Sequence, residues 1–457
     1  MFDGRGALQV SALREVDVRE PRPGWVEQNP EELVASLQAV ITKAVASLGA
    51  RADQISSAGL ATQRSSMVCW DRYTGEALSP VISWQDRRAH EWLDQFSAHT
   101  PEVLHRTGLR LSAHYGASKM RWCLDHLPAV AVARREGRLA MGPLASFLLF
   151  RLLEEKPLLA DPANAARTLL WSIRMLDWDP WLLELFDIPA QALPRSVPTR
   201  HVFGTLRANV YRIPLTIATG DQSAALYALG APPPDTAYIN MGTGAFIQRA
   251  FNQAPSADGL LAGIVYRDAE RSEYVLEGTV NGAGAALKWA EQEWGLKDLE
   301  AQLPAWLARD GDVPLFLNGV AGLGAPFWAA EFDTRLVGNG EPWQKAVAVA
   351  ESIVFLLQVN LEGMQKMQPA SRRILVTGGL ARLDGLCQRL ADLSGLPVYR
   401  PVEHEATTRG TAYLLAGFPT DWPEEKSGDS FISKPDPGLM QRYKDWREKM
   451  KRALEKN

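Results

Sequence analysis

The sequence predicts an α/β fold made of two domains, and three observations support this prediction. Strand, glycine turn and helix alternate in both halves of the chain, as in sheets that are covered by helices. A chain of 457 residues is also too long for a single hydrophobic core. Pro232-Pro233-Pro234 is a stiff segment without backbone donors, which is typical of a boundary between domains. We therefore expect domains at residues 1–230 and 231–457, with a cleft between them.

The first half is expected to begin with an edge hairpin over residues 6–19, where apolar and polar residues alternate. A helix should follow Asn29, because Pro30 favours the first helical turn and apolar residues then recur at helical spacing. Strands are expected at 55–60, 67–70 and 81–84, mostly helical structure at 87–193, and within it a buried helix at 144–153.

The first half should end with an apolar strand at 213–218, which leads through Gly220 into an Ala/Leu-rich helix that Gly230 should stop. The second half repeats the same pattern. Further strands are expected at 238–240, 315–317 and 374–376, and further helices at 383–393 and 437–457. The last of these helices is charged and amphipathic, and we interpret its Lys/Arg excess as a solvated face.

Composition and charge exclude several classes of protein. Hydrophobic residues make up 46% and charged residues 22% of the chain, as in soluble globular proteins. The net charge of −4 offers no basic footprint for nucleic acid, and no run approaches the ~20 apolar residues of a membrane span. The first residues lack the apolar core of a signal peptide. We expect a cytoplasmic protein without nucleic-acid or membrane partners, and the sequence leaves a homo-oligomer open.

The cysteines and histidines do not suggest a metal centre. Cys69, Cys123 and Cys387 are far apart, and the seven histidines are equally scattered. No pair has the spacing of metal ligands, and an odd number of cysteines argues against a disulfide framework. We therefore expect three reduced, buried thiols and no metal held by side chains.

The most informative segment is the turn at Asp221, between an apolar strand and a helix. Such a placement leaves the carboxylate exposed at a helix start, and on its own it would indicate only a helix cap. The neighbouring Gln222 and the downstream Gly242-Thr243-Gly244 loop favour a functional role, because bare backbone and a hydroxyl can hold a phosphate. A carboxylate that can activate an alcohol, beside a phosphate loop, predicts phosphoryl transfer.

Four further positions are candidates for ligand contact. Gly378-Gly379 follows a strand and precedes a helix, which fits either a tight turn or the close approach of a nucleotide. The charged segment Trp84–Arg88 ends a strand, where it lines a cleft or is simply solvated. Arg64 also ends a strand and could donate to substrate hydroxyls, and His114 is either a substrate contact or a structural residue.

Taken together, these segments resemble the FGGY carbohydrate kinases, and within that family the glycerol kinases. The resemblance covers nearly the whole chain, and so many matches in the same order are highly specific. It implies an actin-like, ribonuclease H-like pair of α/β domains that close on ATP and on a sugar or polyol. The segments that carry it are Pro23–Pro30, Trp84–Arg88, Asn164–Thr168, Leu176–Asp179, Gly220–Gln222, Gly242–Gly244, Gly322–Pro326, Gly378–Gly379 and Thr407–Tyr413.

The resemblance also implies roles for individual residues. Asp221 would be the general base that takes the proton of the attacking hydroxyl, and Thr243 would meet the γ-phosphate of ATP. Mg²⁺ would be carried by the phosphates with few direct protein ligands. The residues expected to contact substrate are Arg64, Ser65, Trp84, His114, Gln222 and Phe246, and those expected to contact nucleotide are Gly242, Thr243, Gly244, Gly284, Lys288, Gly378, Gly379 and Leu383.

Several positions depart from the family pattern. Ser65 stands where glycerol kinases have a glutamate, and His114 stands where they have a tyrosine. Two contacts that recognise glycerol are therefore changed, so a larger polyol or a ketose is as credible as glycerol. Lys288 and Leu383 replace amides that normally touch the nucleotide.

The largest departure concerns the N-terminal hairpin with its Asp-x-Gly-Thr phosphate loop. Met1–Gly4 aligns with the end of that hairpin, so the first domain is expected to lack its first strand. Loss of the loop would remove charge stabilisation aimed at the transferring phosphoryl group. Two explanations stay open: a start that lies further upstream, which we prefer because the remaining site is intact, or a catalytically impaired or non-catalytic protein that binds sugar or nucleotide.

Overall fold

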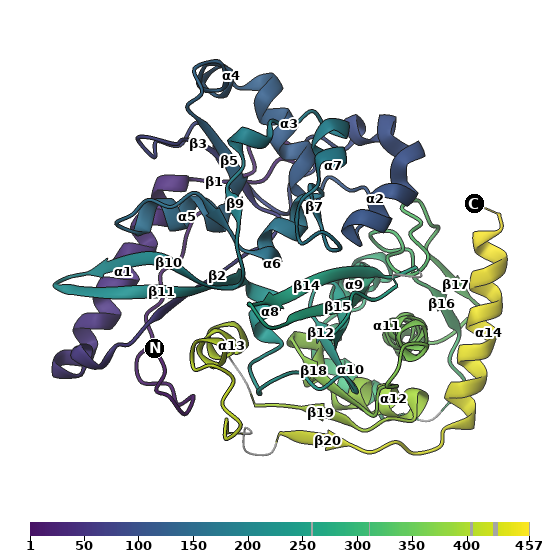
Figure 1. The fold of residues 1–457 in the computed structure, drawn as a ribbon. Coiled ribbons are helices and arrows are strands. Elements are labelled where there is room, and N and C mark those ends of the chain that lie inside the picture. The colour runs from purple at the N-terminus through teal and green to yellow at the C-terminus, as the bar shows by residue number, and fades with distance from the viewer. Residues whose placement is uncertain (257–258, 310, 403–404, 424–427, 457) are drawn as a thin grey trace.

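The computed structural model describes residues 1–256, 259–309, 311–402, 405–423 and 428–456. Its strands form separate sheets in the two halves of the chain, with helices packed around each (Figure 1). The fold is therefore the two-domain α/β architecture that the sequence predicts.

Two sheets organise the first half. In the three-stranded sheet the order is β10-β11-β2, with β11 antiparallel to β10 and parallel to β2. The four-stranded sheet has the order β1-β4-β3-β5. The strands of this half are β1 (Glu27–Gln28), β2 (Ala58–Thr62), β3 (Met67–Asp71), β4 (Val81–Ile82), β5 (Leu139–Pro143), β6 (Leu159–Ala160), β7 (Trp171–Ser172), β8 (Asp177–Trp178), β9 (Arg195–Ser196), β10 (Arg200–Ala208) and β11 (Tyr211–Gly220).

The first long helix, α1 (Pro30–Leu48), shows why these helices form where they do. The Asn29 side chain accepts hydrogen bonds from the backbone N–H groups of Glu31 and Glu32, which would otherwise lack partners at the helix start. The other helices and 3₁₀ turns of this half are η1 (Gly49–Gln54), η2 (Glu91–His99), α2 (Thr100–Thr107), α3 (Gly116–His126), α4 (Pro128–Arg135), α5 (Leu144–Leu152), α6 (Pro162–Ala165), η3 (Ala166–Thr168), α7 (Pro180–Leu185), η4 (Ala190–Ala192) and α8 (Asp221–Ala225).

A seven-stranded sheet of order β14-β15-β13-β12-β18-β19-β20 organises the second half. Its strands are β12 (Thr236–Met241), β13 (Ala245–Phe251), β14 (Leu261–Arg267), β15 (Ser272–Val280), β18 (Arg373–Thr377), β19 (Val398–Arg400) and β20 (Asp429–Phe431), and β16 (Leu315–Leu317) pairs separately with β17 (Arg335–Val337). The helices are α9 (Gly284–Glu293), α10 (Leu299–Leu307), α11 (Pro342–Gln365), η5 (Gly379–Arg382), α12 (Asp384–Ser394), α13 (Ala406–Leu415) and α14 (Pro437–Leu454).

The two halves are joined by packing as well as by the chain. The largest hydrophobic core lies around the seven-stranded sheet, α11 and α14, yet it also includes Trp171 and Ile173 from the first half. Helix α13 follows the seven-stranded sheet in sequence but lies beside β2 and α8 of the first half (Figure 1). These contacts bring segments from both halves to the end of β11.

Two expectations about local structure were wrong. Residues 6–19 contain no strand, and the segment from Met1 to Val26 forms only isolated bridges, Phe2 with Leu8 and Arg19 with Glu27. The alternating pattern is not enough, because a strand also needs a partner edge. The regular helix after Asp221 ends at Ala225, well before Gly230, and tighter turns replace it.

Two helical segments are long and apolar enough, by composition alone, to cross a membrane. These are Pro30–Gln54 and Pro342–Gln365, and the second is 83% buried inside the fold. That degree of burial marks α11 as a core helix of the second half.

Candidate active site

Asp221 lies at the end of β11 as the first residue of α8. Asp221 is partly buried, which corrects the expectation of an exposed carboxylate. Its Oδ1 accepts a hydrogen bond from the Gln222 backbone N–H at 2.7 Å. Burial raises the pKa of Asp221 above its ordinary value, although the positive charges of Arg64 and Arg167 oppose that rise. A carboxylate held in this way is a stronger proton acceptor than one in water.

Arg64, in the loop after β2, lies close enough to act on this carboxylate through its charge. Its side chain crosses Gly220, where a Cβ would stand 2.5 Å from both Arg64 Cγ and Cδ. The guanidinium donates to Gln222 Oε1, so the structure brings Arg64 and Gln222 together beside Asp221. Burial, together with the charge of Arg167, lowers the pKa of Arg64 to about 10, and the group stays cationic at neutral pH.

A buried ion cluster that sequence reasoning missed lies under Arg64. The Glu277 carboxylate on β15 accepts from Arg167 at 3.2 and 2.9 Å and from Gln248 Nε2 at 2.8 Å. Arg64 Nη2 lies 3.7 Å from the same carboxylate. A sequence signal existed, because Glu277 is an acidic residue inside the apolar run of β15, and such a residue requires a buried partner.

Lys119 on α3 links two of the residues expected to contact substrate, Ser65 and His114. Lys119 Nζ donates to the carbonyl oxygens of Ser65, at 2.9 Å, and His114, at 2.6 Å. Ser65 adopts a φ of 62°, and its buried Oγ has no hydrogen-bond partner among the described residues. The Trp84 indole meets the His114 ring edge-on at 5.8 Å between centroids. Burial and nearby cations hold the pKa of His114 well below its usual range, so the imidazole is neutral.

The charges that follow Trp84 have a structural role. Asp86 is fully buried and accepts from the Val26 backbone N–H at 2.6 Å. Arg88 pairs with Asp86 and lies over the rings of Trp25 and Trp122, at 4.1 and 4.6 Å from their centroids. Asp86 and Arg88 therefore brace the strand end and do not line a cleft, whereas Trp84 is 38% exposed beside His114.

The Gly-Thr-Gly loop joins β12 to β13 and lies against the start of α9. Gly242 N–H donates to Gly244 O at 2.8 Å, and Ala285 N–H donates to Thr243 O at 2.9 Å. A Cβ on Gly284 would stand 2.8 Å from Gly242 O, so this close approach depends on glycine. Phe246 follows two residues later on β13, partly buried.

The other residues expected to contact nucleotide differ in how close they lie to the Gly-Thr-Gly loop and in how accessible they are. Gly378 has a φ of 93°, and a Cβ there would stand 2.4 Å from Met241 O, so this turn adjoins the Gly-Thr-Gly loop. A Cβ on Gly379 would meet nothing within 4 Å. Lys288 is exposed one turn along α9, and the Leu383 side chain is packed in the main core, so only its backbone is available to a ligand.

Helix α13 supports the turn at Asp221 from the other side. Thr407 Oγ1 donates to the Asp221 carbonyl oxygen at 3.2 Å. A Cβ on Gly410 would stand only 1.8 Å from Ala224 O, which shows how closely α13 approaches α8. The sequence pattern singled out this segment, but the contact is visible only in the fold.

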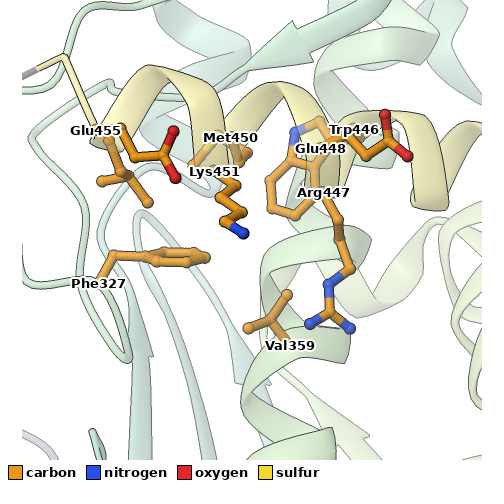
Figure 2. A pocket seen from close by; sticks show the side chains of 9 residues that line it. Phe327, Val359, Trp446, Arg447, Glu448, Met450, Lys451 and Glu455 are labelled. Carbon is orange, nitrogen blue, oxygen red and sulfur yellow. The ribbon is translucent and has the colours of Figure 1, made fainter.

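A surface pocket of about 500 Å³ lies apart from all of these residues. Figure 2 shows it between α14, Phe327 and Val359, with Lys451 and Arg447 extending from the helix. It contains none of the expected site residues.

Sequence comparison assigns the chain to a class. The N-terminal domain of the FGGY family of carbohydrate kinases matches residues 1–228, and the C-terminal domain matches residues 237–417. Glycerol kinase from Alkalilimnicola ehrlichii is 37% identical over 430 residues, which cover 91% of this chain and 86% of that protein. Glycerol kinase 1 from Clostridium tetani is 31% identical, with 99% and 95% covered.

Solved structures show the same fold. A glycerol kinase from Plasmodium falciparum, crystallised with ADP, superposes with a TM-score of 0.89 at 24% identity, covering 99% of this chain and 95% of that one. A ligand-bound xylulose kinase from Lactobacillus acidophilus superposes with a TM-score of 0.81 at 19% identity, covering 99% and 94%. The chain belongs to the FGGY family of carbohydrate kinases. It is a phosphotransferase whose acceptor is a hydroxyl group, with ATP as the phosphoryl donor typical of the family.

Proposed function

We propose that this chain transfers the γ-phosphoryl group of ATP to a hydroxyl of a small polyol or sugar, with Asp221 as the general base. One observation carries the proposal: a partly buried carboxyl with a raised pKa stands at a helix start beside the Arg64–Gln222 pair. A base with a raised pKa accepts the proton of an attacking hydroxyl more readily than an ordinary aspartate.

The acceptor would be held by polar groups that suit neutral hydroxyls. Arg64 and Gln222 supply donors beside Asp221, and the unpartnered Ser65 Oγ and the neutral His114 imidazole supply further partners. Trp84 and Phe246 would pack against the carbon chain. These residues suit glycerol, a larger polyol or a ketose. An activity assay with each class of acceptor distinguishes among them.

The nucleotide would lie against the turns at Gly242–Gly244, Gly284 and Gly378-Gly379. The open space at Gly379 and the close backbone packing at Gly284 fit the approach of a phosphate chain. Thr243 would meet the γ-phosphate, and Lys288 and the Leu383 backbone would lie near the rest of the nucleotide. Mg²⁺ would bind through the phosphates and neutralise their charge, since no cluster of acidic, histidine or cysteine side chains able to hold a metal occurs among the described residues.

At the scale of the chain, the proposal assigns residues 1–230 to the substrate domain and residues 231–457 to the nucleotide domain. Closure of the two would exclude water from the reaction. The proposed setting is the cytoplasm, with small molecules as partners.

The test is a coupled ADP-release assay with glycerol, larger polyols and ketoses, comparing the wild-type chain with Asp221→Asn. We expect one acceptor to support turnover and Asp221→Asn to lower kcat by about 100-fold or more, the usual scale of general-base catalysis. Full turnover by the variant would show that Asp221 is not the base. Binding of acceptor and nucleotide by calorimetry without ADP release from any acceptor would favour the non-catalytic alternative.

A further inference from the structure

Glu277 belongs to neither the expected substrate set nor the expected nucleotide set, yet it connects both halves of the chain. It lies on β15 of the second half, is only 3% exposed, and faces Arg64 and Arg167 from the first half. Its neighbour on the adjacent strand, Gln248, donates a further hydrogen bond at 2.8 Å. Burial raises the pKa of Glu277, but Arg167 and Arg64 together hold it at about 2, so the group is an anion at neutral pH.

Arg64 depends on this anion. Two guanidinium groups meet in a dry interior, and the charge of Arg167 disfavours the charged form of Arg64, while Glu277 favours it. Without a shared anion the two cations repel each other, and a buried cation that loses its partner reorients or draws in water. Asp221 also favours the charged form of Arg64, but Glu277 does so more strongly and is the anion that Arg64 shares with Arg167.

We infer that Glu277 is a positioning residue: a carboxylate from the second half of the chain that holds Arg64 of the first half in place for the acceptor substrate. The inference rests on the proposed function. It means that the acceptor site is assembled from both halves, because its arginine is oriented correctly only while β15 lies against it. Arg167 fixes Glu277 through two hydrogen bonds, whereas Arg64 Nη2 stands 3.7 Å from the same carboxylate.

The chain contains a matched control for this cluster. Glu351 on α11 is also buried and also serves two arginines, Arg389 at 3.1 Å and Arg442 at 2.7 Å. None of these three residues belongs to the candidate site. Glu351→Gln therefore reports what loss of a buried carboxylate between two arginines does to stability alone.

The first experiment compares Glu277→Gln with Glu351→Gln in steady-state kinetics. We expect Glu277→Gln to raise KM for the acceptor by about tenfold or more, the effect of losing one charged hydrogen bond, with a smaller change in kcat and in KM for ATP. Glu351→Gln should lower the melting temperature without changing KM for the acceptor. Glu277→Asp, which keeps the charge, should recover part of the lost affinity. An acceptor KM that Glu277→Gln raises no more than Glu351→Gln would overturn the inference.

The second experiment needs no turnover, so it separates this inference from the proposed function. Melting temperatures are measured for Arg64→Met, Glu277→Gln and the double variant. Coupling between the two side chains predicts that the double variant loses clearly less than the sum of the single losses. Additive losses would show that Glu277 does not act on Arg64, whatever Asp221→Asn does to kcat. Should Glu277→Gln fail to fold, Glu277→Asp takes its place in the cycle; its shorter side chain draws the carboxylate away from Arg64, so the double variant should show a smaller but still non-additive loss.

Discussion

The surroundings of Asp221 disfavour the charged form of its carboxyl group. Burial outweighs the attraction of Arg64 and Arg167, and the pKa of Asp221 therefore rises above its ordinary value of 3.8. A group of this kind costs the folded protein stability once it ionises. The same surroundings that suit a proton acceptor therefore make the site less stable at neutral pH.

Asp221→Asn should consequently raise the melting temperature at pH 7. The raised pKa means that wild-type stability falls as pH rises through the folded pKa, whereas the asparagine variant does not titrate. The gain should shrink towards pH 3, below the ordinary pKa of 3.8, where the wild-type carboxyl is protonated in both states. Thermal unfolding of both proteins between pH 3 and pH 8 measures this difference, and a gain that is independent of pH would contradict the assigned shift.

Lys119→Met should weaken both the fold and the acceptor site. The methionine leaves the buried carbonyl oxygens of Ser65 and His114 without their donor, a loss of about 1–3 kcal/mol in the free energy of unfolding. We also expect a higher KM for the acceptor, because both loops lose their common support. Denaturant unfolding and acceptor titration measure the two effects. Lys43→Met, at an exposed position on α1, serves as the control and should change neither.

The sequence predicted several of the residues that meet at the candidate site, but not all of them. Asp221, Gln222 and Arg64 follow strand ends, a position that the sequence shows directly, and the structure brings these three together. Glu277 contributes to the same cluster from a segment more than 200 residues beyond Arg64, as their numbers show. Local patterns contain no information about which buried charge pairs with which.

At the scale of elements, the contact between α13 and α8 shapes the site. Short helix α8 has only five residues, too few to be stable alone, so its position depends on what packs against it. Gly410 provides the space for that packing, and Thr407 bonds the carbonyl of Asp221 itself. A late segment of the chain therefore supports the turn that holds the proposed base.

Gly410→Ala should lower both the melting temperature and kcat. The added methyl group would lie 1.8 Å from Ala224 O, so α13 and α8 must separate and Asp221 must move. Gly363→Ala is the matched control, since its Cβ on α11 would meet only the side chain of Leu260 at an ordinary 3.6 Å. That control should be neutral or stabilising by about 0.5–1 kcal/mol, because alanine favours a helix over glycine. Equal effects of the two substitutions would refute the proposed role of the α13–α8 contact.

Residues 6–19 do not form the predicted hairpin. Alternation of apolar and polar residues describes a strand with one buried face, yet these residues form no ladder and are mostly exposed. The helix at Asn29 was predicted correctly because its signals, a cap and a proline, act within a few residues. Elements with local signals are predictable, whereas strands depend on a distant edge.

The two halves of the molecule share one hydrophobic interior. Trp171 of the first half is fully buried in the core around the seven-stranded sheet, and the Arg64–Arg167–Glu277 cluster crosses the same boundary. The halves are therefore bound by apolar contacts and by charges, and neither half closes its interior alone.

Unfolding should accordingly be a single cooperative transition in scanning calorimetry. Trp171→Ala should shift that one transition downward by removing about 3–5 kcal/mol of packing, without splitting it into two. Tyr73→Ala, an exposed aromatic at a turn, is the control and should leave the transition in place. Two separate transitions in the wild-type protein would show that the halves are energetically independent.

The sequence by itself determined the α/β class, the family, the two-domain organisation and the turn that presents Asp221, because strand periodicity, glycine turns and helix caps are local properties. Only the tertiary structure decided how deeply Asp221 is buried, that Asp86 and Arg88 are braces, and that Glu277 serves Arg64. The physical reason is that burial and charge pairing depend on which distant segments come into contact. Those contacts are stabilised by the packing of the whole fold.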